Sequence, residues 1–194
     1  MGADIHVRVE YKPYGERSWV DGDFYRRNRW HKEFKEEREY EVVPIYDGRN
    51  YMLFSLLADV RNDGLIEPIC QPKGVPEDCC ESVKKDIEYW DVDGHSHSYF
   101  TLAELIKWHS SNEHKVRVRG FVSPTQARAL DEEGKAPTMW CGWTSEKDWV
   151  EREWKVDIDL LEPIIAAMKR RAVDLFYGSQ GHEEDIRIVF WFDN

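Results

Sequence analysis

The chain has 194 residues, of which 41% are hydrophobic, 13% aromatic and 34% charged. This length and composition predict one globular domain over residues 1–194, with a core large enough to need no disulfide or metal for stability. The formal net charge of −11 argues against nonspecific binding to DNA, RNA or an anionic membrane, because such binding needs lysine and arginine on one face. It favours a well-solvated cytoplasmic protein, or an acidic protein that competes with nucleic acid for a basic partner.

The cysteines indicate a reducing compartment. None of the four is spaced as a CxxC pair, and the vicinal two would bridge each other only with strain. No apolar run of membrane length and no leader-like start is evident in the sequence. We therefore expect reduced thiols, a cytosolic protein and no membrane association. The four residues are Cys70, Cys79, Cys80 and Cys141.

The first predicted element is a strand over residues 4–11, where apolar and polar residues alternate. Ile5, Val7 and Val9 would lie on its buried face. Asn50 is the expected N-cap of a later helix. The elements after the first strand are a turn at 12–15, a hairpin or irregular segment with a charged helix over 16–40, a short strand over 42–46, a helix over 50–60 and a long connection over 61–78.

The second half is predicted mainly from helix caps. Thr101 and Glu104 form a capping-box pattern, and Ser123 with the following proline opens a shorter helix that Gly134 ends. His109, near the end of the first of these helices, is expected to interact with the helix dipole. The other elements are a helix from Glu77 or Asp78 to Glu88, a strand over 115–122, a helix over 157–176 and a strand over 185–193.

Helices and strands mix without a regular β-α-β alternation. This order predicts an α+β fold in a single domain, with one mixed or antiparallel sheet that includes both terminal strands and has helices packed on it. The apolar run at 185–193 favours a strand buried on both faces. If the terminal strands pair, Asp193 would approach Asp4.

Two short segments place metal-capable side chains two residues apart. Residues i and i+2 of an extended strand point to the same face, so Asp4 and His6 would project together, as would His95 and His97. If the segments meet, these four side chains would hold a divalent metal, zinc or manganese. The alternative is that both segments are solvated surface and bind no ligand.

A metal held this way would activate a water molecule, with Asp93 or Glu183 as the proton carrier. This predicts a metal-dependent hydrolase of a phosphoester or nucleotide. A metal with four closed protein ligands would instead have a structural role, tying the N-terminal strand to the histidine segment.

Asp4-x-His6, Gly22-Asp23 and Gly94-His95-x-His97 resemble fragments of the calcineurin-like metallophosphoesterase pattern, which combines DxH, GDxxD, GNH(D/E) and GHxH. However, Arg26 stands where the second acid of GDxxD belongs, and GNH(D/E) does not occur in the chain. We therefore exclude that fold and keep only the ligand chemistry.

Segments along nearly the whole chain resemble a family of bacteriophage and prophage proteins that open with MGCDIH. Here Ala3 replaces the family's cysteine, so no thiol acts at that position. The resemblance implies a phage-encoded domain in the host cytoplasm and no settled activity. It also supports a second class of function, a non-catalytic accessory protein that binds or inhibits a host defence protein. The similar segments are Met1–Val7, Asn50–Arg61, Asp93–Ser98 and Val189–Asp193.

Overall fold

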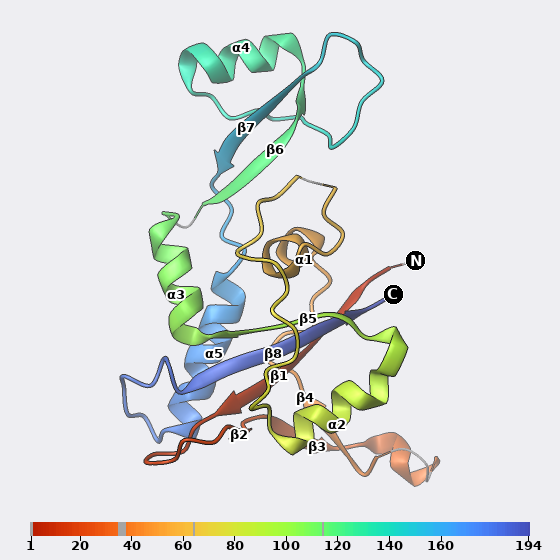
Figure 1. Cartoon of the computed structure of the whole chain (residues 1–194), viewed down its shortest axis with the longest axis vertical. Helices are drawn as coiled ribbons and strands as arrows, with labels where there is room; N and C mark the ends of the chain where they lie inside the picture. Colours follow the sequence, from red (N-terminus) through yellow and green to blue (C-terminus); the bar gives the residue numbers. More distant parts are fainter. Residues whose placement is uncertain (1, 35–37, 64, 114) are drawn as a thin grey trace. The chain divides into compact units, whose positions relative to one another are not determined.

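The computed structural model describes residues 2–34, 38–63, 65–113 and 115–194 (Figure 1). Contacts within the chain divide it into two compact units. Unit 1 comprises Met1–Arg49, Lys73–Leu105 and Pro163–Asn194, and unit 2 comprises Asn50–Pro72 and Ile106–Glu162. One domain over residues 1–194 stays a prediction.

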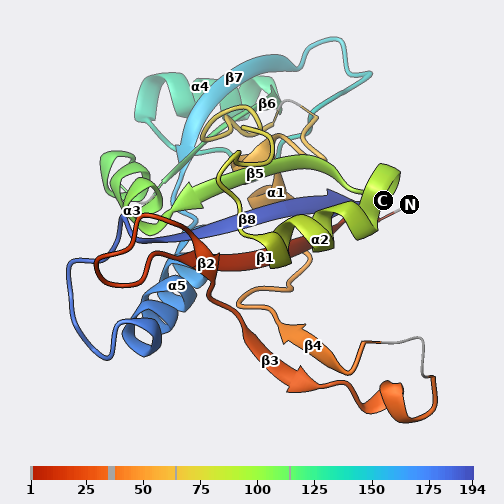
Figure 2. The same ribbon diagram turned by 60° about the horizontal axis from the view of Figure 1, so that its bottom comes forward.

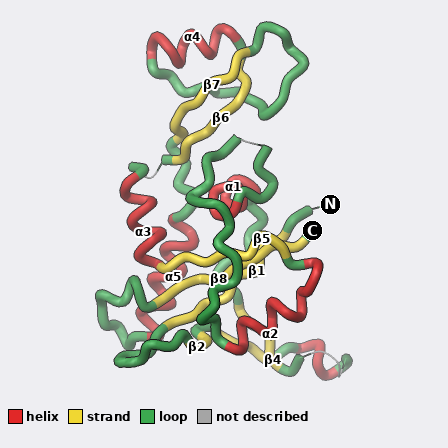
Figure 3. The backbone as a smooth tube through the Cα atoms, viewed as in Figure 1, coloured by secondary structure: helices red, strands yellow, loops and turns green. Residues whose placement is uncertain are grey.

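A four-stranded antiparallel sheet forms the centre of unit 1, with the strand order β2-β1-β8-β5 (Figures 1 and 3). Its strands are β1 (Asp4–Tyr11), β2 (Val20–Asp21), β5 (His95–Thr101) and β8 (Ile186–Asp193). β1 and β8 pair along their whole length, and β8 is buried at all but its last residue. The predicted α+β fold, with both terminal strands in one antiparallel sheet, is confirmed.

The alternation in β1 gives this sheet two different faces. Val7 and Val9 point to an apolar face that they share with Phe190, which is paired with Val7. α5 (Glu162–Leu175) reaches this face, because Leu175 of α5 and Val9 of β1 both lie next to Gly22. A Cβ atom added at Gly22 would be 3.3 Å from the Leu175 side chain and 3.1 Å from that of Val9. The alternation pattern therefore correctly predicts the buried apolar face of β1.

The opposite face of the sheet carries the polar residues of β1 and is covered by α2 (Glu81–Trp90) (Figure 2). Val83 of α2 packs on Val189 of β8. α2 begins a few residues later than expected, and its N-cap residue Cys80 makes no side-chain capping hydrogen bond. A short 3-10 helix, η2 (Asp91–Asp93), leads from α2 into β5.

A separate hairpin in unit 1 consists of β3 (Phe24–Arg27) and β4 (Tyr40–Val43) (Figure 2). A hairpin was expected within residues 16–40, but the second strand of this hairpin, β4, instead overlaps the short strand expected over 42–46. Instead of a longer charged helix, the described part of the segment between the strands contains the 3-10 helix η1 (Arg29–Lys32); residues 35–37 lie outside the described residues.

The predicted helix caps are confirmed. Leu53 N donates to Asn50 Oδ1 at 3.2 Å, Glu104 N donates to Thr101 Oγ1 at 3.1 Å, and Thr101 N donates back to Glu104 Oε2 at 2.8 Å. Ser123 caps the third helix. These helices are α1 (Tyr51–Ala58), α3 (Leu102–Ser111) and α4 (Pro124–Glu133).

Unit 2 contains a two-stranded antiparallel sheet of β6 (Val116–Val122) and β7 (Val150–Val156). The sequence analysis did not predict β7. Trp140 packs edge-on against Trp154 of β7, with ring centroids 5.5 Å apart. A Cβ at Gly120 would lie 3.0 Å from Trp140, so this close approach needs glycine.

Candidate functional site

The pairing of β1 with β8 builds a polar corner at the C-terminal end of β8, which we call the Asp4–Asp193 corner and define as Asp4, His6 and Asp193. Asp4 lies directly opposite Asp193, and Asp4 N donates to Asp193 Oδ1 at 3.2 Å. His6 Nε2 is 3.3 Å from Asp193 Oδ2, although the geometry is not that of a hydrogen bond. Like charges directly opposite each other repel, so positive charge beside this corner is stabilising.

Arg49 supplies positive charge at this corner. Its Nε and Nη2 donate to the two carboxylate oxygens of Asp4 at 2.8 and 2.5 Å. These hydrogen bonds hold the pKa of Asp4 below its usual range. A pocket of about 400 Å³ lies over the corner, and Asp47, Asp86 and Trp90 also line it.

Trp191 separates two of the histidines that the metal prediction would join. β8 lies between β1 and β5, and the Trp191 ring stacks beside His6 with a centroid distance of 5.6 Å and beside His97 with 6.1 Å. No set of described residues that includes His6 and His97 brings three ligand atoms within 4.8 Å of one another, so a metal shared by these two histidines stays a prediction. Burial, together with His95, lowers the pKa of His97.

A β-bulge places His95 and His97 on different faces of the sheet. Ser96 has a left-handed φ of 52°, and the register between β5 and β8 shifts between His95 and Ser98. His95 pairs with Phe192, whereas His97 stacks on Trp191, and neighbouring residues of β8 point to opposite faces. The prediction that His95 and His97 project together is wrong, because the extra residue of the bulge breaks the two-residue alternation.

Buried ring nitrogens without a hydrogen-bond partner among the described residues gather around Trp191. Buried polar atoms in folded proteins are usually paired. Their concentration here therefore indicates a region suited to a polar ligand. They are His6 Nε2, His97 Nε2 and Trp191 Nε1, whereas His95 Nε2, which is also unpaired, lies on the opposite face of the sheet.

The two predicted proton carriers lie at opposite ends of β8. Asp93 directly precedes Gly94, which borders Trp191, so it is at the same end as the Asp4–Asp193 corner. Glu183 precedes β8, whose eight residues span roughly 25 Å. Glu183 is therefore too far away to serve a metal at this corner, whereas Asp93 lies at the same end of the strand.

Arg8 is the centre of a buried ion network next to the corner. Its side chain is 4% exposed and donates to the carboxylates of Asp23 and Asp86, and to Asp21 at 2.9 Å. Burial raises the pKa of Asp23 to about 6, against the attraction of Arg8. The network ties β1 to β2 and α2 and so fixes the strand that carries His6.

Unit 2 contains a different metal-capable group. Among the described residues it is the one set of three such side chains whose ligand atoms lie within 4.8 Å of one another, and it consists of His109, Asp159 and Glu162. Asp159 Oδ1 is 2.8 Å from His109 Nε2 and accepts a hydrogen bond from Glu162 N at 3.0 Å. Asp159 thus caps α5, which begins at Glu162 rather than at residue 157.

The sequence analysis did not propose these three residues as ligands. The spacing Asp159-x-x-Glu162 before an apolar helix was a usable signal for a cap. Nothing in the sequence brought His109 to that cap, because the pairing is a tertiary contact between residues 50 positions apart.

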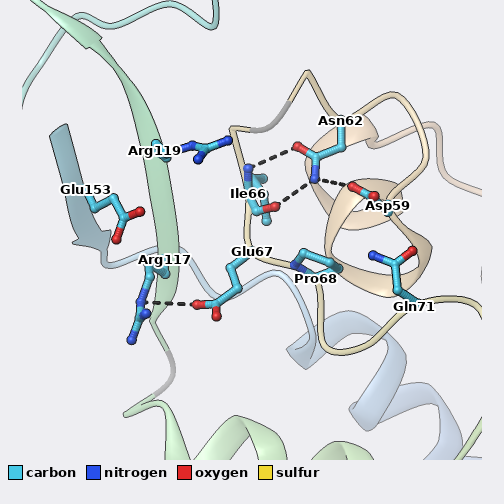
Figure 4. Close-up of a pocket in the computed structure, with 9 residues that line it drawn as sticks. All are labelled: Asp59, Asn62, Ile66, Glu67, Pro68, Gln71, Arg117, Arg119 and Glu153. Atoms are coloured by element: carbon cyan, nitrogen blue, oxygen red, sulfur yellow. Dashed lines mark hydrogen bonds and ion pairs between the residues drawn. The ribbon is translucent and has the colours of Figure 1, made fainter. Parts of the chain in front are cut away.

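A pocket of about 280 Å³ in unit 2 is closed on one side by Asn62 (Figure 4). Asn62 accepts from Ile66 N at 3.0 Å and donates to Ile66 O at 2.7 Å and to Asp59 at 2.6 Å. Arg117 at its rim pairs with Glu67 at 3.1 Å. Because these polar groups form hydrogen bonds and an ion pair with one another, we interpret the pocket as part of a structural turn and not as a ligand site.

No helix in the described part of the chain is both long and apolar enough to span a membrane. Comparison of the chain with known protein families, curated proteins and solved structures finds no match. The resemblance to phage proteins therefore stays a prediction.

Proposed function

We propose that the protein binds a divalent cation, zinc or manganese, at the Asp4–Asp193 corner and uses it to hydrolyse a phosphoester or nucleotide. The observation that supports this most is the register of β1 and β8, which sets Asp4 opposite Asp193 with His6 beside them. One imidazole and two carboxylates suit either metal. As they stand, the ligand atoms of Asp4, His6 and Asp193 are not all within 4.8 Å of one another, so Asp4 would have to turn from Arg49 to the metal. Three protein ligands would then leave a coordination position open, which favours a catalytic over a structural role.

A divalent cation at the corner would replace Arg49 as the partner of Asp4. The Arg49 side chain is 54% exposed, and exposed ion pairs contribute about 0–1 kcal/mol to stability, so losing this pair costs little. A charge of +2 also offsets both carboxylates, which one guanidinium does not. Arg49 and the metal would thus compete for the same oxygens.

The chemistry follows from the open position. A bound metal lowers the pKa of a coordinated water toward neutrality. The water oxygen would bond to phosphorus as the bond to the leaving oxygen breaks, and Asp93 would carry the water proton to that oxygen.

Calorimetric titration of untagged protein with Mn²⁺ or Zn²⁺ tests the site. We expect one binding event that His6→Gln and Asp193→Asn each weaken by more than about tenfold, because each removes a ligand. Arg49→Ala should strengthen binding, because Asp4 is then no longer shared. Manganese-dependent release of nitrophenolate from bis(4-nitrophenyl) phosphate measures the hydrolysis. Asp93→Asn should slow this release without weakening metal binding.

Two matched variants decide where the metal binds. His97→Gln, beyond Trp191, and His109→Gln, in unit 2, should leave the affinity unchanged. Loss of binding with His109→Gln alone would overturn the proposal in favour of the unit 2 group. Loss of metal binding with His97→Gln would overturn it in favour of the four-ligand site predicted from sequence. If about 1 mM metal produces no binding at all, both of these sites are ruled out.

A second function, a phage accessory protein that binds a host protein, is favoured by exposed aromatic side chains on the hairpin of unit 1. Phe24, Trp30 and Phe34 are 51, 54 and 50% exposed. Aromatic residues are enriched at protein interfaces. Binding to a purified host protein that is lost with Trp30→Ser and Phe34→Ser together, but kept with His6→Gln, would support this function over the hydrolase.

A further inference from the structure

A second and larger cleft in unit 1 lies between the β3–β4 hairpin and α2, with His6 and Arg8 of β1 also lining it. We call it the hairpin cleft. Its volume is about 990 Å³, at the upper end of the range for small-molecule sites. It shares His6, Arg8 and Trp90 with the pocket over the Asp4–Asp193 corner, so the two form adjoining parts of one concave surface.

The aromatic lining of the hairpin cleft is not explained by core packing. Tyr89 of α2 is 75% exposed, and Tyr40 of β4 is 55% exposed. Trp90 lies deeper, with its ring 4.1 Å from that of His6. Exposed aromatic faces stack with nucleic-acid bases, because every base presents a flat π surface.

The charge of the hairpin cleft also differs from that of the whole chain. Its lining has two accessible cations, Arg38 and Lys85, and two carboxylates, Glu41 and Asp86, in a chain with a net charge of −11. Arg8 also lines the cleft, but it is 4% exposed and paired with Asp21, Asp23 and Asp86. Lys85 is exposed and forms no ion pair with another described residue. An anionic group would therefore meet less repulsion here than the net charge of the chain implies, and Lys85 offers it an exposed cation.

The cations and the aromatic rings are close enough to serve one ligand. The Arg38 guanidinium lies 5.3 Å from the centre of the Tyr89 ring and also donates to Asp86. Lys85 and Tyr89 lie four residues apart on α2 and hence on the same side of that helix. Because Arg38 lies over the Tyr89 ring, a base stacked there would take the place of that contact and leave Arg38 to bind an attached phosphate together with Lys85.

We propose that the hairpin cleft binds a mononucleotide, with the base stacked on Tyr89 and the phosphate at Arg38 and Lys85. This names the substrate class of the proposed hydrolase and in that respect rests on the proposed function. Binding itself needs no metal, so it can be measured separately. A single nucleotide fits better than a polynucleotide, because the net charge of −11 opposes a long anionic strand.

Calorimetric titration with AMP in the presence of EDTA tests the cleft in the full chain. We expect Tyr89→Ala to weaken AMP binding by about tenfold to a hundredfold through lost stacking. Lys85→Met should weaken AMP binding more at low salt than at high salt, because salt screens the attraction between Lys85 and the phosphate. Ribose 5-phosphate, which lacks the base, and adenosine, which lacks the phosphate, should each bind more weakly than AMP.

Tyr177→Ala and Lys135→Met are matched controls, because these side chains are 97% and 72% exposed and lie outside the cleft. They should leave AMP binding unchanged. No AMP binding, or binding unaffected by Tyr89→Ala, overturns the proposal even if metal binding is intact. Oligothymidylate binding more tightly than AMP also overturns it, in favour of single-stranded DNA.

The two proposals fail in different ways. Asp4→Asn with Asp193→Asn should abolish metal binding and leave AMP binding in EDTA within about twofold, since neither residue lines the hairpin cleft. AMP binding without any metal binding would rule out the proposed hydrolase and support the nucleotide site.

Discussion

The two faces of the sheet in unit 1 are both buried around the middle of β1 and are chemically opposite. Val9 and Ile188, paired on the apolar face, are 0% exposed, while Arg8 and Glu10 on the other face are 4% and 0% exposed. Apolar burial stabilises the fold without a specific partner. Buried charge does not, because desolvation costs several kcal/mol per ion. Burial alone therefore does not identify the stabilising core of this unit.

The polar face is tolerated because its charges are paired. Glu10 Oε2 accepts from Arg187 Nε at 2.7 Å, and Arg187 Nη1 donates to Asp78 at 2.8 Å. Buried pairs of this kind add little net stability compared with apolar residues. Their value here is geometric, because they hold the strand that presents His6 next to the proposed site. Three variants test this difference between the faces.

The largest expected effect comes from Arg8→Leu. This change leaves Asp21, Asp23 and Asp86 without their shared cation, so we expect a loss of about 3–5 kcal/mol in the free energy of unfolding. Urea denaturation measures it. Arg26→Leu is the matched control, since Arg26 pairs with Glu41 at 2.6 Å but is 62% exposed and should cost at most about 1 kcal/mol. Similar losses for both variants would show that burial does not matter.

A smaller effect is expected from the pH dependence of Asp23. Its pKa is raised to about 6 by burial, so the folded state favours the protonated carboxyl. The contribution of Asp23 to the free energy of unfolding is fully present below pH 4. It is lost as the pH rises through 6, by up to about 3 kcal/mol. Asp23→Asn should remove that loss when unfolding is measured from pH 4 to 7.

Asp131 provides the control of opposite sign. Its hydrogen bond with Arg152 lowers its pKa, so its contribution is present above the ordinary carboxyl pKa and is lost as the pH falls. Asp131→Asn should therefore leave the fall in stability between pH 4 and 6 unchanged. A pH profile of Asp23→Asn that matches the wild type would contradict a raised pKa at Asp23.

The smallest effect is expected on the apolar face. Ile188→Val removes one methylene group from a fully buried site and should cost about 0.5–1.5 kcal/mol in urea denaturation. Val92→Ala, at an 88% exposed residue, should change stability by less than about 0.5 kcal/mol. The Ile188 variant should leave metal and AMP binding unchanged, and a change in either would show that the two faces are coupled.

Local signals in the sequence predicted most elements. The caps at Asn50, Thr101 and Ser123 depend on side chains within three residues of the backbone groups that they satisfy, so their position is encoded locally. β7 was missed although its exposed and buried residues alternate at Glu153 and Trp154, because its exposed face is highly charged and two-stranded pairing with β6 is not a local property.

By itself, the sequence determined that Asp4 and His6 share one face of a strand, since alternation follows from extended backbone. Only the tertiary structure decided which residues join them. The register of β1 and β8 brings Asp193 to Asp4, and the bulge at Ser96 turns His95 away from His97. Register and bulge are set by strand pairing and by packing on both faces, and these contacts link residues up to 189 positions apart.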